Sequence, residues 1–450
     1  MQVQTQQKPD TSKVRRAAAA SFLGSMLEYY DFYIYGAAAA LVFGRVFFPG
    51  SSHGALLALA TFGVAYVARP VGAVVLGHFG DRIGRKKVML FTLVLMGAST
   101  FLIGCIPSYE EIGWLAPALL VLFRLTQGFS AAGEQSGANS LTLEHAPEGR
   151  RAFFCSWTLS GTQGGFILAS LVFIPVASFN EEFLATWGWR IPFWASAFVL
   201  LLAYVLRRKL EEPEIFVEGH KNDDDAARTT EATPAADKMP IVEALQNQWR
   251  DILRVILCAF IAVTGSIFSI FGLAFATSDA VGVSESTMLW VAITANAIAL
   301  GIQPFMGILA DKIGRKPMFI GGTLGCAVFV FVYFHAIMTG NVGLIFLTAI
   351  LLTSICYSAP NAIWPSFYAE WFNTRVRYTG IAVGTQIGFA LAGFAPMIAW
   401  ALIGDSETNW LPVAILTAVC CVVSAGAAMT ATETFKTPLA RLGARDTVTA

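Results

Sequence analysis

Charged side chains are scarce in this sequence. Its 450 residues include 30 Lys+Arg and 30 Asp+Glu, so 13% are charged, whereas 56% are hydrophobic and the mean hydropathy is +0.61. A soluble domain carries roughly 25% charged residues, so this chain lacks the polar side chains that cover a water-facing surface. The net charge of zero also gives no basic surface for a nucleic acid. We therefore expect an integral membrane protein that contacts the lipid bilayer and no nucleic acid.

Cysteine is also uninformative. The seven cysteines are odd in number and scattered, mostly within apolar runs, and they have neither the spacing of a metal site nor that of a disulfide framework. No nucleophile paired with a base stands out either. The sequence therefore predicts no metal and no cofactor, and it disfavours a membrane-embedded enzyme.

Long apolar runs are what the sequence has in abundance. A helix that crosses the hydrocarbon core needs about 20 mainly apolar residues. Twelve runs qualify: 17–43, 56–79, 88–106, 115–141, 153–176, 191–206, 252–275, 289–309, 318–338, 342–368, 381–403 and 411–429. The first run is not a secretory signal, because Glu28 and Asp31 interrupt it and eleven more runs follow.

The runs divide into two sets of six, separated by a polar interval. We predict an all-α membrane protein with a cytoplasmic tail at 1–16, a six-helix bundle at 17–206, a cytoplasmic linker at 207–251, a second six-helix bundle at 252–430 and a cytoplasmic tail at 431–450. A short surface helix is expected near 241–245. The linker itself carries no chemistry that we can identify.

Lysine and arginine predict the orientation. If the N-terminus is cytoplasmic, all basic residues fall on that side except Arg45 and Arg190 outside and Arg69 and Arg124 within spans. Cytoplasmic loops of membrane proteins are enriched in basic residues. We therefore expect both termini in the cytoplasm, in a bacterial inner membrane.

A short motif occurs twice. Residues 77–87 read GHFGDRIGRKK and residues 307–317 read GILADKIGRKP, at the same end of spans two and eight. A weaker echo sets Glu144 and Arg151 against Glu370 and Arg377. Two similar halves in parallel orientation are typical of repeat-built transporters.

The composition of this motif suits a loop at a membrane surface. Glycines allow a tight turn, an aspartate can cap the positive N-terminal end of a neighbouring helix, and basic residues attract anionic lipid. Glu134 is expected to act as a gate partner of Arg82 or Arg85. We assign gating or structural roles to Gly77, Asp81, Arg82, Gly84, Arg85, Glu134, Asp311, Gly314, Arg315 and Arg377.

With these repeats, the chain resembles the major facilitator superfamily, which implies twelve helices in two six-helix bundles around a central cavity. Residues 124–129, RLTQGF, resemble the fourth-span motif whose arginine, here Arg124, is associated with proton coupling. The glycine-proline motif of the antiporters is not matched, since Gly161, Gly164 and Gly165 lack the proline. This departure argues against drug efflux.

Other segments resemble the metabolite:proton symporter branch. They are residues 28–36, 127–134, 144–151, 188–193, 210–213 and 375–380, and residues 39–49 and 60–87 are most similar to organic-acid carriers of the shikimate, 2-oxoglutarate and citrate type. Two departures, Ala132 and residues 371–373, concern loop detail more than the fold.

Four charges are expected near the bilayer midplane. A charge there costs about 2.5 to 3.5 kcal/mol even on lenient scales, so each needs a partner or a wet cavity. Helical rise puts Glu28 and Arg69 roughly 18 Å from the cytoplasmic interface and Arg124 roughly 15 Å from the outer one. Asp31 lies one turn from Glu28.

The two carboxylates lie on one face of span one, together with Tyr35. Carboxylates so close in a poorly solvated cavity do not both ionise easily, so Asp31 and Glu28, with Arg124, are our candidates for proton coupling. The alternative is that both are permanent ion-pair partners of Arg69 and Arg124. The sequence leaves open which carboxylate faces which arginine, and whether Arg69 binds substrate or only pairs helices.

The predicted substrate contacts are an arginine fork for an anion and polar or aromatic groups for the rest of the molecule. They are Arg124, Arg69, Tyr30, Tyr35, Gln127, Trp364 and Gln386. The second half has no midplane charge, and its Asn and Gln residues could equally join helices.

Charge counting suggests the mechanism. Glu28 and Asp31 cancel Arg69 and Arg124, so a bound monocarboxylate leaves one negative charge, which one proton neutralises. We expect a monomeric, proton-driven symporter of a small organic acid, such as shikimate or another mono- or dicarboxylate. A carrier of zwitterionic osmolytes of the proline or betaine type is the alternative, and a drug-efflux carrier is less favoured.

Overall fold

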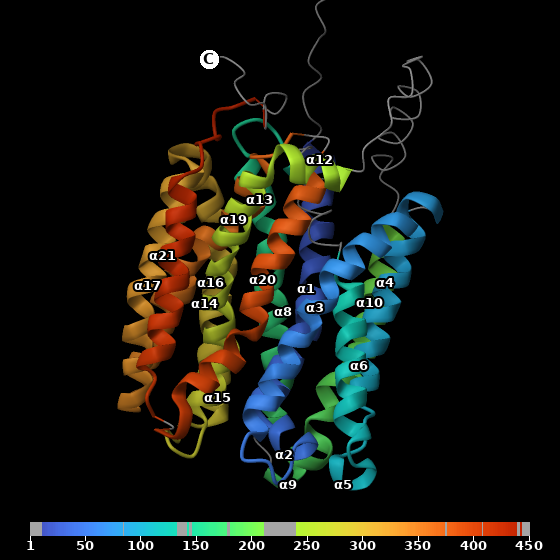
Figure 1. Ribbon diagram of the computed structural model, residues 1–450, viewed down its shortest axis with the longest axis vertical. Helices are drawn as coiled ribbons and strands as arrows, with labels where there is room; N and C mark the ends of the chain where they lie inside the picture. Colours follow the sequence, from blue (N-terminus) through green and yellow to red (C-terminus); the bar gives the residue numbers. More distant parts are fainter. Residues whose placement is uncertain are drawn as a thin grey trace, which may run out of the picture.

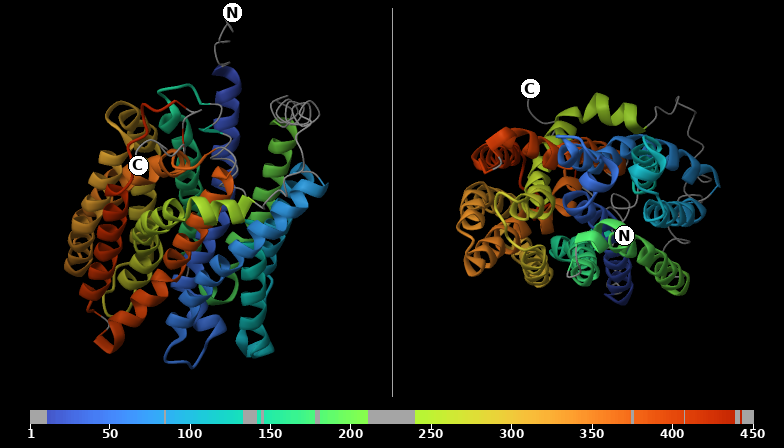
Figure 2. Two further views of the ribbon diagram at one scale, coloured as in Figure 1. Left: turned by 45° about the horizontal axis from the view of Figure 1, so that its top comes forward. Right: turned by 90° about the horizontal axis from the view of Figure 1, so that it is seen from below.

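A computed structural model describes residues 11–83, 85–132, 142–143, 146–177, 181–210, 240–373, 376–406, 408–438 and 442. The regular elements in this part of the chain are all helical. They form two groups that run roughly parallel to one long axis (Figure 1), and the view along this axis places the first half of the chain beside the second (Figure 2, right).

The described part of the first half contains six long helices and several short segments. The long helices are α1 (Thr11–Leu41), α3 (Gly54–Ile83), α4 (Arg85–Ile103), α6 (Leu115–Ser130), α8 (Arg151–Ala177) and α10 (Arg190–Leu210). The short ones are α2 (Phe43–Phe47), α5 (Tyr109–Ile112), α9 (Glu181–Phe183) and the π-helical η1 (Leu184–Gly188).

The second half follows α12 (Pro240–Asn247), which lies where the sequence predicts a short surface helix. Its four uninterrupted long helices are α16 (Glu285–Ile313), α17 (Arg315–Thr339), α20 (Arg377–Ile403) and α21 (Leu411–Met429). Predicted span seven consists of α13 (Trp249–Cys258), η2 (Ala259–Ile261), α14 (Ala262–Ser266), η3 (Ile267–Phe271) and α15 (Gly272–Ala276). Predicted span ten consists of α18 (Val342–Ala349), η4 (Ile350–Tyr357) and α19 (Ser358–Ala369), and η5 (Gly404–Ser406) follows α20.

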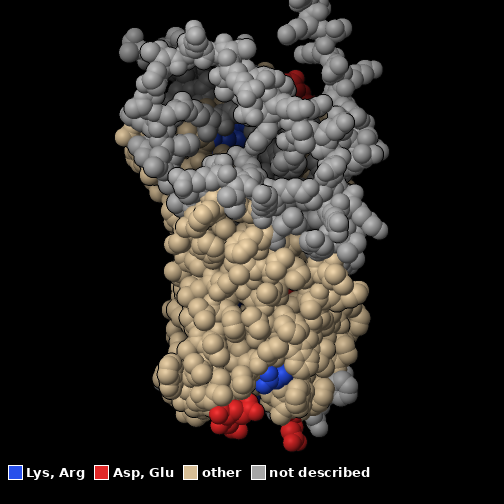
Figure 3. Space-filling model, turned by 90° about the vertical axis from the view of Figure 1, so that its right-hand side faces the viewer, with Lys and Arg blue, Asp and Glu red and all other residues tan. Residues whose placement is uncertain are grey.

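The long helices have the length and hydropathy of membrane spans. Among the described residues, eight helices are long and apolar enough to cross a bilayer, and residues 91–103 and 115–130 form shorter apolar helices. The face in Figure 3 carries its visible charges near the two ends, with an almost uncharged band between them. The fourth predicted span extends to residue 141, but α6 ends at Ser130 and residues 133–141 lie outside the described chain.

The halves pack along helix pairs that are distant in sequence. Helix α8 of the first half packs on α16 of the second, and α3 packs on α20. Within the first half α1 packs closely on α8. The absence of a side chain at Gly165 allows this approach, since a Cβ atom there would lie only 2.4 Å from the Met26 carbonyl oxygen. Helix α1 begins and α21 ends at the same end of the bundle (Figure 1), which we call the terminal end.

Candidate functional site

A cavity lies between the two halves, about midway along the helices that form it. It contains ≈ 1020 Å³ of empty space, part of it open to solvent. Helices α1, α3 and α8 form one wall, and segments from η2 to η3, α16, η4, α19 and α20 form the other. Ligand cavities of proteins are typically apolar with a few polar groups, and this one fits that description.

Aromatic side chains dominate the cavity wall. They are Tyr29, Phe32, Tyr33, Phe62, Tyr66, Phe166, Phe268, Tyr357, Trp364, Tyr368 and Phe389. Amides and hydroxyls, including Asn296 and Asn361 from the second half, add hydrogen-bonding groups. Within the described chain, Arg69 is the one charged residue that lines the cavity.

Arg69 pairs with Glu28. The Arg69 Nη2 atom lies 3.6 Å from Glu28 Oε1, and both side chains are almost completely buried. The guanidinium group also lies 4.4 Å from the centre of the Phe32 ring and 4.6 Å from that of Tyr66. Its Nε has no hydrogen-bond acceptor among the described residues. Arg69 therefore faces the cavity with an unsatisfied donor and a long, weak ion pair.

Asp31 lies beside a hydrogen-bonded chain that contains Arg124. The Thr100 hydroxyl donates to the Met96 carbonyl at 3.0 Å and lies beside Asp31, whose carboxylate is within electrostatic range of both Arg124 and Glu28. Gln127 joins Thr100 to Arg124, since its Nε2 donates to Thr100 Oγ1 at 2.8 Å and its Oε1 accepts from Arg124 Nη1. The structure thus answers a question that the sequence left open, because Glu28 faces Arg69 and Asp31 lies beside the chain that contains Arg124.

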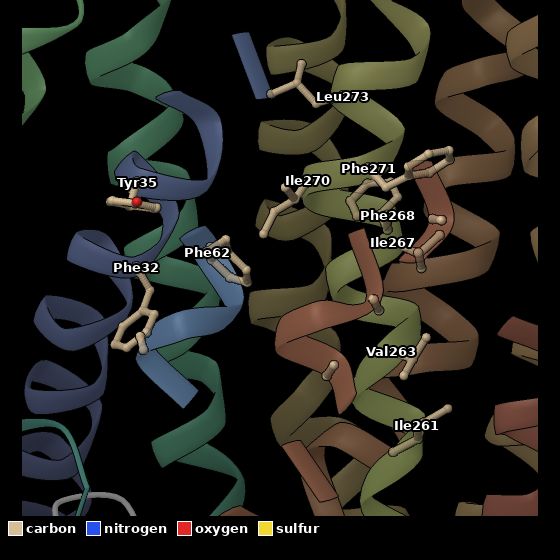
Figure 4. Packing of buried hydrophobic residues seen from close by; sticks show 14 of the residues in the cluster. Phe32, Tyr35, Phe62, Ile261, Val263, Ile267, Phe268, Ile270, Phe271 and Leu273 are labelled. Carbon is tan, nitrogen blue, oxygen red and sulfur yellow. The ribbon is translucent and has the colours of Figure 1, made fainter. Parts of the chain in front are cut away.

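Arg124 is sealed from the cavity. Its Nη2 donates to the Phe62 carbonyl at 3.1 Å, and its guanidinium carbon lies 3.9 Å from the Tyr35 ring centre, 4.8 Å from that of Phe32 and 5.0 Å from that of Phe62. Figure 4 shows these rings on α1 and α3, opposite the apolar residues around Ile270. Arg124 is fully buried and is not among the residues that line the cavity.

The other predicted substrate contacts divide in the same way. Trp364 lines the cavity. Tyr30 donates to the Pro192 carbonyl at 2.9 Å and Tyr35 to Thr61 Oγ1 at 2.7 Å, so both hydroxyls are engaged away from the cavity. Gln127 and Gln386 are buried but do not line the cavity, although Gln386 Oε1 has no partner in the described chain.

Sequence reasoning missed several residues of the site. Phe32 and Tyr66 contact Arg69, and Thr100 contacts Asp31, yet aromatic and threonine residues are ordinary in apolar spans. The position of Phe32, one turn after Glu28 and next to Asp31, is a signal that could have been used. Asn296 and Asn361 are ordinary polar residues in their spans, and only the structure places them at the cavity.

The terminal end contains a second polar cluster that joins the halves. Arg315 Nη2 lies 3.0 Å from Asp311 Oδ1 and 3.1 Å from Glu370 Oε1, and Arg151 Nη1 lies 3.3 Å from the same Glu370 oxygen. Asp311 accepts hydrogen bonds from the backbone N–H groups of Ala152 and Phe153, at 3.1 and 2.9 Å. An aspartate of the repeated motif therefore caps α8, as the sequence suggests.

The turn of the repeated motif in the second half requires glycine. Gly314 has φ +111°, and a Cβ atom there would lie 2.6 Å from Glu433 Oε2. Glu433 in turn accepts from the backbone N–H groups of Arg315 and Lys316, at 3.1 and 2.8 Å. Arg377 donates to the carbonyl of Ala369 at 3.2 Å.

The first copy of the motif is not described in the same detail. Gly84 and Glu134 lie outside the described residues, and the side chains of Gly77, Asp81, Arg82 and Arg85 are likewise not described. The expected contact of Glu134 with Arg82 or Arg85 therefore stays a prediction.

Comparison with known proteins gives consistent matches over most of the chain. The family described as "Sugar (and other) transporter" matches residues 17–442. The shikimate transporter of Escherichia coli is 37% identical over 426 residues, covering 93% of this chain and 94% of that protein. The proline/betaine transporter of Salmonella typhimurium is 32% identical over 409 residues, covering 90% and 80%.

Solved structures resemble the fold. The proton:xylose symporter XylE bound to 6-bromo-6-deoxy-D-glucose superimposes with a TM-score of 0.70 at 19% identity, covering 96% of this chain and 99% of that one. The inward open conformation of XylE from Escherichia coli gives a TM-score of 0.67 at 19% identity, covering 95% and 99%.

Proposed function

This chain belongs to the sugar (and other) transporter family, and we propose that within this family it imports a small organic acid together with a proton. Its fold is that of the major facilitator superfamily, and by family it is a transporter rather than an enzyme. The two halves would expose the central cavity alternately to each side of the membrane. The similarity to a shikimate transporter makes shikimate a first candidate.

The observation that carries the proposal is the Glu28–Arg69 pair. Arg69 is the cation of the cavity wall, its Nε lacks an acceptor in the described chain, and its ion pair is 3.6 Å long. A substrate carboxylate can meet the edge of the guanidinium group. It must then compete with Glu28 for the same positive charge.

A proton on Glu28 removes that competition. Protonated Glu28 no longer attracts Arg69, so the arginine is released to the substrate, and the total charge of Glu28, Asp31, Arg69, Arg124, a monocarboxylate and one proton is zero. Proton and substrate therefore stabilise the same state, which is the thermodynamic requirement for coupling. Asp31 and Arg124 complete the charge balance from behind the cavity wall, and Gln127 bonds both Arg124 and Thr100 beside Asp31.

A zwitterionic osmolyte is the second candidate. An aromatic cavity can bind a quaternary ammonium group through cation–π contacts, Arg69 could take the carboxylate, and relatives of this chain are proline/betaine transporters. Asn296 and Asn361 favour the organic acid, because their amides can bond hydroxyl groups that betaine lacks.

The remaining features of the proposal concern the setting. We place the chain in a bacterial inner membrane as a monomer, with both termini in the cytoplasm, so that the terminal end faces inward. The Asp311 and Glu370 contacts would then close the inner side.

Net uptake into proteoliposomes that contain no substrate tests the function, because exchange by counterflow moves no net protons. Labelled shikimate, 2-oxoglutarate, citrate, protocatechuate and betaine are offered while the internal pH is recorded. The proposal predicts uptake of an organic acid with acidification of the lumen. Uptake of betaine alone, or organic-acid uptake without proton movement, contradicts it.

Because Asp31 contributes to the charge balance, Asp31→Asn should abolish acid-driven accumulation and spare exchange at equal pH.

A further inference from the structure

The first half has two buried arginines near the cavity, but only one of them lines it. Two arginines lie close to the middle of the first half, and both contact the Phe32 ring, at 4.4 Å for Arg69 and 4.8 Å for Arg124. Only Arg69 is in contact with the cavity. The Phe32 ring therefore contacts both an arginine that lines the cavity and one that does not.

Phe62 completes the cover over Arg124. Its ring centre lies 5.0 Å from the Arg124 guanidinium carbon and its carbonyl accepts from Arg124 Nη2. Phe32 and Phe62 are both cavity-lining, and both are almost fully buried. Arg124 Nε, like Arg69 Nε, has no acceptor in the described chain. The buried Arg124 guanidinium group, whose central carbon contacts both rings, thus keeps one donor without an acceptor in the described chain.

We propose that Phe32 and Phe62 set the number of carboxylates that the carrier accepts, by leaving one guanidinium in the cavity and screening the second. This inference rests on the proposed function, since it concerns the substrate of the same site. The substrate class is a monocarboxylate with an uncharged body that packs on the aromatic wall and bonds Asn296 and Asn361. Phe32 and Phe62 are then specificity-determining residues.

The physical reason is the cost of an unpaired buried charge. A second carboxylate on the same body would enter an aromatic wall without a second cation, and removing an ion from water without a partner is expensive. A proton on that carboxylate would relieve the cost, but would add a second proton to each transport cycle. At neutral pH the wild-type carrier should therefore reject dicarboxylates.

The test compares the binding of two ligands that have the same ring but different numbers of carboxylates. Cyclohexanecarboxylate and cyclohexane-1,3-dicarboxylate differ by one carboxylate, and each is measured as an inhibitor of counterflow and as a stabiliser of the purified protein against heat. We expect the dicarboxylate to bind at least about 100-fold more weakly to the wild type, since each factor of ten corresponds to about 1.4 kcal/mol.

Removal of either ring should change this selectivity. Phe32→Ala opens a path to Arg124, and we expect the dicarboxylate to come within about tenfold of the monocarboxylate. Phe62→Ala keeps the backbone carbonyl that binds Arg124 and should also strengthen dicarboxylate binding relative to monocarboxylate binding. It serves as a second variant if Phe32→Ala folds poorly. Phe389→Ala is the matched control, because Phe389 lines the opposite wall beside Trp364 and its loss enlarges the cavity without uncovering Arg124.

A double variant identifies the cation responsible. Adding Arg124→Gln to Phe32→Ala should remove the gain in dicarboxylate binding. If Phe389→Ala gains as much as Phe32→Ala, cavity size sets the selectivity and the proposal is wrong. Equal binding of both ligands by the wild type also overturns it, while leaving proton-coupled acid transport intact. Failure of the proposed function has a different signature, namely no acid-driven uptake of any carboxylate.

Discussion

At the residue scale, two arginines that look alike in the sequence have different surroundings. Arg69 faces the cavity and Arg124 is covered by aromatic rings. The sequence predicts that both lie near the bilayer midplane, because the position of a residue within a long apolar run gives its depth in the membrane. It cannot show which neighbouring rings lie over a guanidinium group, so it predicts both Arg124 and Arg69 as substrate contacts. Of the two, the structure places only Arg69 at the cavity.

Replacement of Arg69 by lysine tests that assignment. Arg69→Lys keeps the charge but loses the planar fork and its stacking between Phe32 and Tyr66. We expect KM for the transported acid to rise about tenfold or more, because the bidentate contact is lost. Arg190→Lys is the control, since Arg190 also stacks on a ring, that of Trp189 at 4.6 Å, but donates to carbonyls outside the cavity. An unchanged KM in Arg69→Lys would remove Arg69 from the substrate site.

At the element scale, hydropathy predicts the helices well and their interruptions poorly. The twelve predicted runs correspond to helices in the described chain, but two of them contain π-helical segments, η3 and η4, beside the cavity. A π-helical turn depends on neighbouring packing and not on apolar composition, so periodicity does not reveal it. Close packing of two helices at a glycine likewise cannot be predicted from the sequence, because the sequence does not show which helix lies against it.

Gly165 gives a prediction at this scale. A Cβ there would lie 2.4 Å from the Met26 oxygen and 2.8 Å from the Tyr30 nitrogen, both backbone atoms of α1. Gly165→Ala should therefore push α1 from α8 and destabilise the protein by about 1–3 kcal/mol. Gly301→Ala is the control, since a Cβ at Gly301 meets nothing within 4 Å. Thermal unfolding in detergent measures both, and equal melting temperatures would contradict the close packing of α1 on α8.

At the scale of the whole molecule, polar contacts at the terminal end join the halves. Asp311 of the second half caps α8 of the first, and Glu370 pairs with Arg151 across the same boundary. The repeat predicts that the motif aspartate can cap a helix, but not which one. Which helix Asp311 caps depends on how the two halves of the chain pack against each other, and the sequence of one motif does not contain that information.

Asp311→Asn should loosen this end. The amide retains one acceptor oxygen but loses the charge that pairs with Arg315. Hydrogen bonds to charged groups contribute about 1.5–3 kcal/mol, so amide exchange at Ala152 and Phe153 should become roughly ten- to hundredfold faster, provided that opening limits exchange. Asp251→Asn, which breaks an ion pair within α13, serves as the control. Unchanged exchange at the start of α8 would argue against a closing role for Asp311.

The account depends most on Glu28 as the group whose proton releases Arg69. The most direct test compares Glu28→Gln with the wild type in proteoliposomes, measuring acid-driven accumulation of the transported acid beside its counterflow at equal pH. Glutamine imitates protonated Glu28, so the account predicts that accumulation is lost, that counterflow persists and that KM at neutral pH falls. A Glu28→Gln carrier that still accumulates its substrate against a gradient when the outside is acidified would contradict it.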